Sequence, residues 1–163
     1  MQRILGIGFC LLLGFGPQIL LAKEPPREVL GFNLHMTEAE VRARLKEIGT
    51  FVRAEKHDEA WKIKDDPSFS DVIVGFGKGG QLRYITAVAR EDKDAKRVAY
   101  GEVGKMKEAR QAGDVKIKNF NYQWQLPVRG GDPEVSVIAM GRDPKYLSTL
   151  SLKRLGRQER DDD

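Results

Sequence analysis

The strongest constraint on the fold is a glycine-rich tetrapeptide, Gly77-Lys78-Gly79-Gly80, that separates two β-strand patterns. Residues 71–76 before it contain alternating valines, and residues 82–89 after it read LRYITAVA. Glycine adopts positive φ at no steric cost, as the tight turn of a β-hairpin requires. The segment therefore predicts an antiparallel hairpin. A phosphate-binding loop is excluded because glycine, not Ser or Thr, follows the lysine and a strand follows the glycines.

Further segments are rich in β-forming residues, which predicts additional strands in the same sheet. They cover residues 61–64, 115–126, 135–140 and 146–152. A Gly-Arg-Asp-Pro turn at residues 141–144 joins the last two, because Gly and Pro favour turn conformations. We expect these strands to form an antiparallel sheet.

The first helix is predicted from a capping box, Thr37 followed three residues later by Glu40. In this motif the hydroxyl accepts a free backbone N–H and the carboxylate reaches back to the N-cap N–H. Val41, Leu45 and Ile48 then recur at helical spacing, and a glycine follows. We expect an amphipathic helix over residues 37–48.

A second helix is predicted over residues 92–113, a segment rich in Lys, Arg, Glu and Ala. One stripe of this helix would contain Ala95, Ala99, Val103 and Met106. Gly101 and Gly104 oppose it, since each costs about 1 kcal/mol in a helix interior. The fold class expected from all these elements is α+β, with one or two short helices packed on an antiparallel sheet.

The two halves of the chain echo each other. Residues 61–64 (WKIK) resemble residues 115–118 (VKIK), and the hairpin at residues 71–90 resembles residues 134–154, given one inserted residue. A helix candidate precedes the strands in each half. Two tandem α-β-β-β units that share one sheet would explain this order. Coincidence of strand composition is the alternative.

The N-terminal segment has the layout of a secretory signal. A basic start at Arg3 precedes an apolar run, and Ala22 is a small residue suited to cleavage. We expect export to the periplasm or secretion; an uncleaved membrane anchor is the alternative. Cys10 lies inside the apolar run and is not a lipid-accepting cysteine. The predicted segments are a signal peptide (1–22), an extended leader (23–30), one α+β domain (31–155) and a charged flexible tail (156–163).

The inventory of reactive side chains excludes several classes of protein. The chain has 163 residues, enough for one domain, but only one cysteine and two histidines. Neither a disulfide scaffold nor a structural zinc site can be assembled from these. Removing Arg3 from the 28 basic side chains leaves a net charge of +3 against the 24 acidic ones, too little to suggest nucleic acid as a partner. No metal or cofactor is expected.

No catalytic constellation emerges from the polar residues. His35 lies beside a helix start and His57 in a charged stretch, so both are expected at the surface. The Asp65-Asp66 pair lies in a proline-containing loop, where a turn is the better interpretation. None of the serines that could join a triad lies in a Gly-x-Ser-x-Gly elbow; they are Ser68, Ser70 and Ser148. No catalytic residue is assigned, although a small secreted hydrolase without a recognisable motif stays open.

One strand pattern suggests a binding surface. In an unbroken strand, Lys116, Lys118, Phe120, Tyr122 and Trp124 would project from one face, with Asn and Gln residues on the other. We predict binding residues at Lys116, Lys118, Tyr122 and Trp124, which would suit a partner segment, an anionic chain or a sugar polymer. The alternative is that the aromatic residues are core, with a bulge or turn near Asn119 that switches the inward phase.

Residues 34–37 (LHMT), followed by Val41, Leu45 and Gly49, resemble the opening of small envelope proteins of the BamE (SmpA/OmlA) and beta-lactamase-inhibitor-protein-like group. In that group a Gly-Met-Thr or Gly-Met-Ser step begins a helix that packs on an antiparallel sheet; His35 replaces the glycine here. The resemblance implies an exported, non-enzymatic interaction module. We therefore expect a binding or assembly module of the cell envelope or secreted fraction with a protein partner; a carbohydrate-binding protein is a further alternative.

Overall fold

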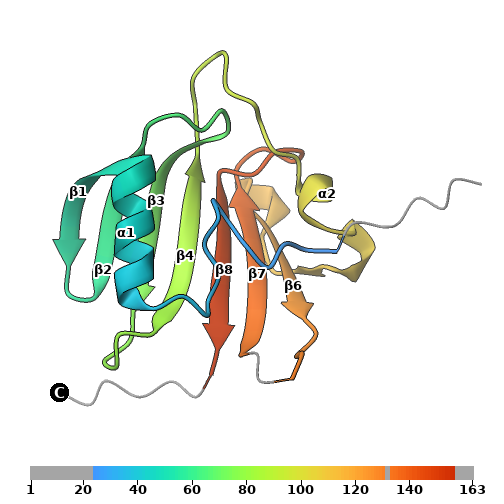
Figure 1. Ribbon diagram of the computed structural model, residues 1–163. Coiled ribbons are helices and arrows are strands. Elements are labelled where there is room, and N and C mark those ends of the chain that lie inside the picture. The colour runs from blue at the N-terminus through green and yellow to red at the C-terminus, as the bar shows by residue number, and fades with distance from the viewer. Residues whose placement is uncertain (1–23, 131–132, 157–163) are drawn as a thin grey trace, which may run out of the picture.

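The computed structural model describes residues 24–130 and 133–156 of the chain. Within them lies one eight-stranded antiparallel sheet of order β1-β2-β3-β4-β8-β7-β6-β5 (Figure 1). The strands are β1 (Gly49–Glu55), β2 (Asp58–Ile63), β3 (Phe69–Phe76), β4 (Leu82–Ala89), β5 (Arg110–Gln111), β6 (Phe120–Leu126), β7 (Glu134–Gly141) and β8 (Thr149–Leu155). The helices are α1 (Glu38–Ile48), α2 (Tyr100–Val103) and the 3-10 turns η1 (Met106–Glu108) and η2 (Val115–Ile117). The α+β class with an antiparallel sheet is thereby confirmed.

The predicted hairpin is present as β3 and β4, and β4 spans the expected residues 82–89. Its turn is closed by two backbone hydrogen bonds: the Gly77 N–H donates to the Gln81 carbonyl (2.8 Å), and the Gly80 N–H donates to the Gly77 carbonyl (2.9 Å). Gly80 has a φ of 74°, so the turn uses the conformational freedom that predicted it.

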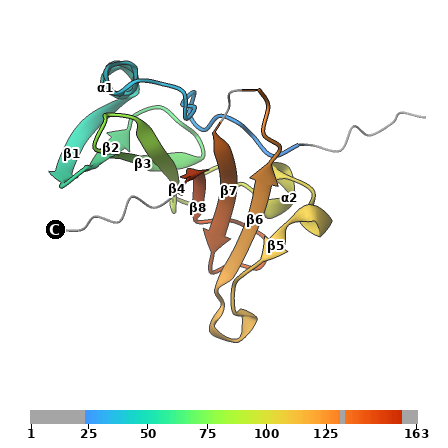
Figure 2. The ribbon, with the colours of Figure 1, turned by 90° about the horizontal axis from the view of Figure 1, so that it is seen from below.

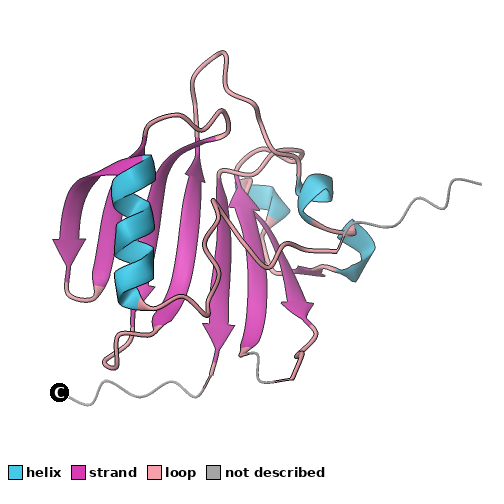
Figure 3. Cartoon of the chain, viewed as in Figure 1, coloured by secondary structure: helices cyan, strands magenta, loops and turns pink. Residues whose placement is uncertain are grey.

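Helix α1 begins with the predicted capping box. The Glu40 N–H donates to the Thr37 hydroxyl (3.3 Å), and the Thr37 N–H donates to the Glu40 carboxylate (2.7 Å). Val41 and Leu45 are fully buried beneath the helix, which stands over the first strands of the sheet (Figure 3). Gly49, which follows the helix, does not adopt the left-handed conformation that is common for a glycine in this position. It is extended and starts β1, where a Cβ would lie 2.6 Å from the Lys62 carbonyl oxygen.

The capping box gives a prediction for stability and its pH dependence. Thr37→Ala is expected to cost about 1 kcal/mol, because a free N–H in the first turn loses its acceptor. The Thr37 backbone hydrogen bond holds the pKa of Glu40 below its ordinary value. The stability from this carboxylate is therefore present above its unfolded-state pKa of about 4.5 and lost as pH falls through the folded-state value. Urea unfolding at pH 7 and pH 3 measures both effects.

The matched variant is Glu40→Gln, which keeps the size of the side chain and removes its titration. Its unfolding midpoint is expected to fall less than that of the wild type on acidification. Parallel midpoint-against-pH curves for the two proteins would show that the capping box does not contribute to the acid sensitivity.

Two sequence expectations about local structure are wrong. The helix expected over residues 92–113 is reduced to α2 and η1, because Gly104 is extended and packs against Trp124, whose ring would lie 3.0 Å from an added Cβ. The strand expected over residues 115–126 begins only at Phe120. The residues before it form η2 and a turn in which Lys118 has a φ of 54°.

The residues after Glu24 form a strap that lies against the sheet. This N-terminal strap (residues 24–35) crosses β8 and β7 on the side that carries α1 (Figures 1 and 2). Val29, Phe32 and Leu34 are at most 4% exposed, so the strap belongs to the hydrophobic core. The predicted signal peptide, residues 1–22, and residues 157–163 of the predicted tail lie outside the described residues.

One buried carboxylate ties α1 to the sheet. Glu59 on β2 is 8% exposed and accepts hydrogen bonds from Arg42 Nε (2.8 Å) and Trp61 Nε1 (3.1 Å). The same guanidinium pairs with Glu38, one turn earlier on the helix. A buried charge needs such partners, and here they also fix the helix over the strands.

Candidate functional site

The two faces of the sheet differ in what covers them. The helix α1, the strap and α2 all lie on one side (Figure 2), where the large apolar side chains are buried. Among the described residues no helix of more than one turn lies over the opposite face. We call that opposite face the open face, and it is the first candidate for an interaction surface.

The middle of the open face is free of charged side chains. Register pairs join six residues from six strands into one row, which we call the central row. In spatial order it contains Ala60, Ile73, Thr86, Ser151, Ile138 and Gln123. The Thr86 and Ser151 hydroxyls lie 2.8 Å apart in a hydrogen bond. Most of the row is half-buried although nothing described packs on it, because neighbouring side chains shield one another.

Charged groups on the open face lie at the two ends of the central row, where Ala60 pairs with Arg53 and Gln123 pairs with Arg110, and in the rows beside it. The row on one side contains, in spatial order, Lys62, Asp71, Val88, Thr149, Met140 and Asn121. On the other, Asp58, Gly75, Tyr84, Lys153, Ser136 and Gln125 lie in line. An uncharged centre with an aromatic residue, a methionine and charges around it is the composition of many protein–protein contact surfaces.

Tyr84 is a fixed part of this surface. Its ring lies directly over Gly75, where an added Cβ would come 2.2 Å from a ring carbon. Burial first, and then a hydrogen bond to the Asp58 carboxylate, raise the pKa of Tyr84 above its ordinary value. Tyr84 therefore presents a neutral aromatic ring on the open face.

The structure separates the four residues predicted to bind. Trp124 lies on the covered face, is 2% exposed and donates through Nε1 to the Lys105 carbonyl (3.0 Å). Tyr122 is half-buried, with its ring centroid 4.7 Å from that of Tyr100. Lys116 and Lys118 are exposed in the turn before β6. The alternative interpretation, aromatic core residues with a turn near Asn119, is the one the structure has.

The core position of these aromatic residues also affects their chemistry. Burial, followed by the neighbouring Tyr122 and Asp143, raises the pKa of Tyr100 to about 12.

A sugar ring could not stack on the Trp124 indole unless the indole left its packed position in the core. The residues of β6 on the open face are Asn121, Gln123 and Gln125. Their alternation with the aromatic residues in the sequence predicted that they lie on the opposite face from the aromatic side chains.

The polar residues considered for catalysis lie in separate places. His57 is exposed in the β1–β2 turn, and Ser70 donates to its neighbour Asp71 (2.6 Å). Asp66 accepts from the N–H groups of Ser68 and Phe69 (both 2.8 Å), as expected for a turn. Within residues 24–130 and 133–156, no cluster of three or more His, Cys, Asp or Glu side chains could hold a metal ion.

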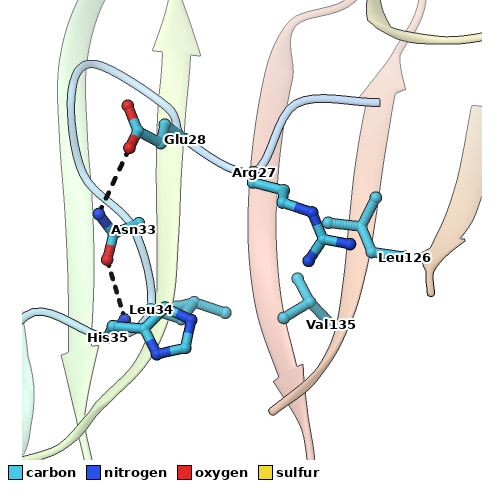
Figure 4. A pocket seen from close by; sticks show the side chains of 7 residues that line it. All are labelled: Arg27, Glu28, Asn33, Leu34, His35, Leu126 and Val135. Atoms are coloured by element: carbon cyan, nitrogen blue, oxygen red, sulfur yellow. Dashed lines mark hydrogen bonds between the residues drawn. The ribbon is translucent and has the colours of Figure 1, made fainter. Parts of the chain in front are cut away.

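A small pocket between the strap and the ends of two strands is the second candidate site (Figure 4). It has a volume of about 190 Å³. Its lining consists of Arg27, Glu28, Asn33, Leu34, His35, Leu126 and Val135. His35, expected at the surface, is exposed at the edge of this pocket.

Comparison of the chain with protein-family models, curated proteins and solved structures gave no match. No helix in the described part of the chain has the length and apolar character needed to cross a membrane. The functional argument therefore depends on the fold and the two candidate sites, which are the open face of the sheet and the small pocket beside the strap.

Proposed function

We propose that this chain is a non-catalytic binding or assembly module that acts through protein–protein contacts, with the open face as its contact surface. The observation that carries this proposal is the uncharged central row, which runs across six strands without a covering layer in the described residues. Desolvating Thr, Ser, Gln and Ile side chains costs less than desolvating charges, so a partner can bury this row favourably.

The proposed place of action is the cell envelope or the secreted fraction. Support for export comes from the sequence of residues 1–22, with its basic start, apolar run and small residue at position 22. The resemblance of residues 34–49 to BamE-like envelope proteins supports the same assignment. The partner is then an envelope or secreted protein.

We also propose that the fold consists of two tandem helix-and-sheet units. The strand order supports this, since β1-β2-β3-β4 is followed in space by β8-β7-β6-β5, as a two-fold axis between β4 and β8 would produce. The repeat of residues 61–64 at 115–118 contributes nothing, because the first segment lies mainly in β2 and the second mainly in η2.

Matching contacts at the two helix starts support the same proposal. The N-cap of α1, Thr37, forms an isolated bridge with Gln81, the residue before β4. The N-cap of α2, Ala99, forms one with Tyr146, three residues before β8. A buried valine follows each N-cap by four residues, Val41 and Val103 respectively. The helices of the two units would then differ in length, and the strap would cover part of the second unit's sheet, in the place that the longer α1 covers in the first unit.

The binding proposal is tested by placing a charge in the central row. Tagged protein lacking residues 1–22 is incubated with its native envelope and secreted fractions, mildly crosslinked and captured, and bound proteins are identified by mass spectrometry. Thr86→Arg and Gln123→Arg are expected to reduce recovery of the main partner about tenfold or more, because a buried unpaired charge opposes association. Both side chains are half-buried at the surface, so both variants are expected to fold, with Thr86→Arg losing about 1 kcal/mol because it breaks the hydrogen bond to Ser151; urea unfolding checks this.

The control is Ala39→Arg, which adds the same charge on the exposed side of α1. It is expected to capture the partner as well as the wild type. Equal recovery with all three variants, or no stoichiometric partner with the wild type, would overturn the assignment of the open face.

A further inference from the structure

The pocket beside the strap has opposite charges on its two sides. On one side the Arg27 guanidinium lies against Leu126 and Val135, and its Nη2 donates to the Pro127 carbonyl (2.7 Å) (Figure 4). On the other side lie the Glu28 carboxylate and the Asn33 amide (Figure 4). The hydrogen bond to Pro127 thus places the Arg27 guanidinium at the end of β6.

The strap holds the second side through a strained turn. Val29 and Phe32 exchange backbone hydrogen bonds (both 2.9 Å) around Leu30 and Gly31, whose φ angles are 56° and 77°. Glycine adopts this left-handed conformation freely, whereas for leucine it is strained because Cβ approaches the carbonyl oxygen. Burial of Val29 and Phe32 in the core stabilises the turn and keeps it in place.

This turn brings the polar groups of the pocket together. Asn33 Nδ2 donates to Glu28 Oε1 (3.5 Å), and Asn33 Oδ1 accepts from the His35 N–H (3.0 Å). The carboxylate and the amide therefore present oxygen acceptors on the side opposite the guanidinium. Acceptors of this kind bind an ammonium group.

Between the two sides, three apolar residues form the rest of the lining. They are Leu34, Leu126 and Val135, each at most 7% exposed. The volume of the pocket is about 190 Å³. It is smaller than the pockets of about 300 Å³ or more that hold drug-sized ligands.

We propose that this pocket binds a small aliphatic zwitterion, an amino acid or a dipeptide. The carboxylate of the ligand pairs with Arg27, its ammonium group with Glu28 and Asn33, and its aliphatic side chain contacts Leu126 and Val135. A guanidinium recognises a carboxylate through paired hydrogen bonds, and the apolar lining excludes larger polar ligands. This site is separate from the open face and does not depend on the proposed protein–protein function.

Isothermal titration calorimetry of the protein with glycyl-L-leucine and with L-leucine tests the proposal. At least one of them is expected to bind with a Kd of about 1 mM or below, and the comparison distinguishes the dipeptide from the free amino acid. N-acetyl-glycyl-L-leucine lacks the ammonium group and glycyl-L-leucinamide lacks the carboxylate. Each is expected to bind about tenfold more weakly than the better zwitterion.

Variants assign the two charges to their residues. Arg27→Gln and Glu28→Gln are each expected to weaken binding about tenfold. The control Arg129→Gln removes a guanidinium that pairs with Glu24 outside the pocket (3.4 Å), and it should leave the affinity unchanged. The proposal would be overturned if neither zwitterion bound at a concentration tenfold above the expected Kd, or if the blocked analogues bound as tightly as the zwitterions. Both of these outcomes are measured on the wild-type protein, so they do not depend on the folding of a variant.

Discussion

Replacing Trp124 with alanine is expected to destabilise the protein by about 3–5 kcal/mol. The side chain is 2% exposed and lies on the covered face of the sheet, opposite Val137 in the register of β6 and β7. Its removal leaves a cavity between β6 and the segment that contains Gly104, which packs against the indole. It also leaves the Lys105 carbonyl without the indole N–H that now donates to it.

Urea denaturation with circular dichroism measures this effect, and Trp61 remains as a fluorescent reporter. Trp124→Phe separates the two contributions, because it fills most of the volume but lacks the N–H, and a smaller loss of about 1–3 kcal/mol is expected. The control Lys116→Ala alters an exposed side chain and should stay within about 0.5 kcal/mol of the wild type. A loss below 1 kcal/mol for Trp124→Ala would return this residue to the predicted binding surface.

Those elements whose signals are local could be predicted from the sequence. The hairpin of β3 and β4 is encoded by its glycines, and α1 by the capping box at Thr37. Both signals act between residues a few positions apart, so the rest of the fold does not change their meaning. The α+β class followed from them and from the strand patterns.

The elements that depend on distant contacts could not be predicted. Strand β1 is an edge strand whose residues after Gly49 are all exposed, so it lacks the alternation that identifies strands. Helix α2 is short because the chain after Val103 must pass close over Trp124, a contact between segments 20 residues apart. The inward phase of β6 depends on the turn in which Lys118 has a positive φ, a conformation that a lysine does not predict.

The candidate sites follow the same division. The amides of the open face, such as Gln123, were visible as the polar half of an alternating strand, but only the sheet register joins them to Ser151 and Thr86. The pocket could not be foreseen, because Arg27 and Glu28 read as a polar leader. Only the burial of Val29 and its neighbours brings these two charges to the ends of β6 and β7.

Replacing Phe32 with alanine is expected to destabilise the protein by about 3–5 kcal/mol as well, although this residue precedes the first helix and lies outside the sheet. Its ring is fully buried in the core, and its backbone closes the strained turn at Leu30 and Gly31. Removing the ring creates a cavity beneath the strap and also removes the packing that opposes the strain. Urea unfolding at neutral pH measures the loss.

The matched control is Phe51→Ala on β1, where the same ring is 51% exposed and packs edge-on against Trp61 with centroids 5.4 Å apart. Because only about half of this ring is buried, its removal loses about half of the transfer free energy and leaves no enclosed cavity. We therefore expect a loss of about 1 kcal/mol for Phe51→Ala. If residues 24–35 were a detachable leader, Phe32→Ala would cost no more than this control. A threefold larger loss for Phe32 would place the strap inside the cooperative core. The charges of the pocket would then be held by the same packing that stabilises the fold.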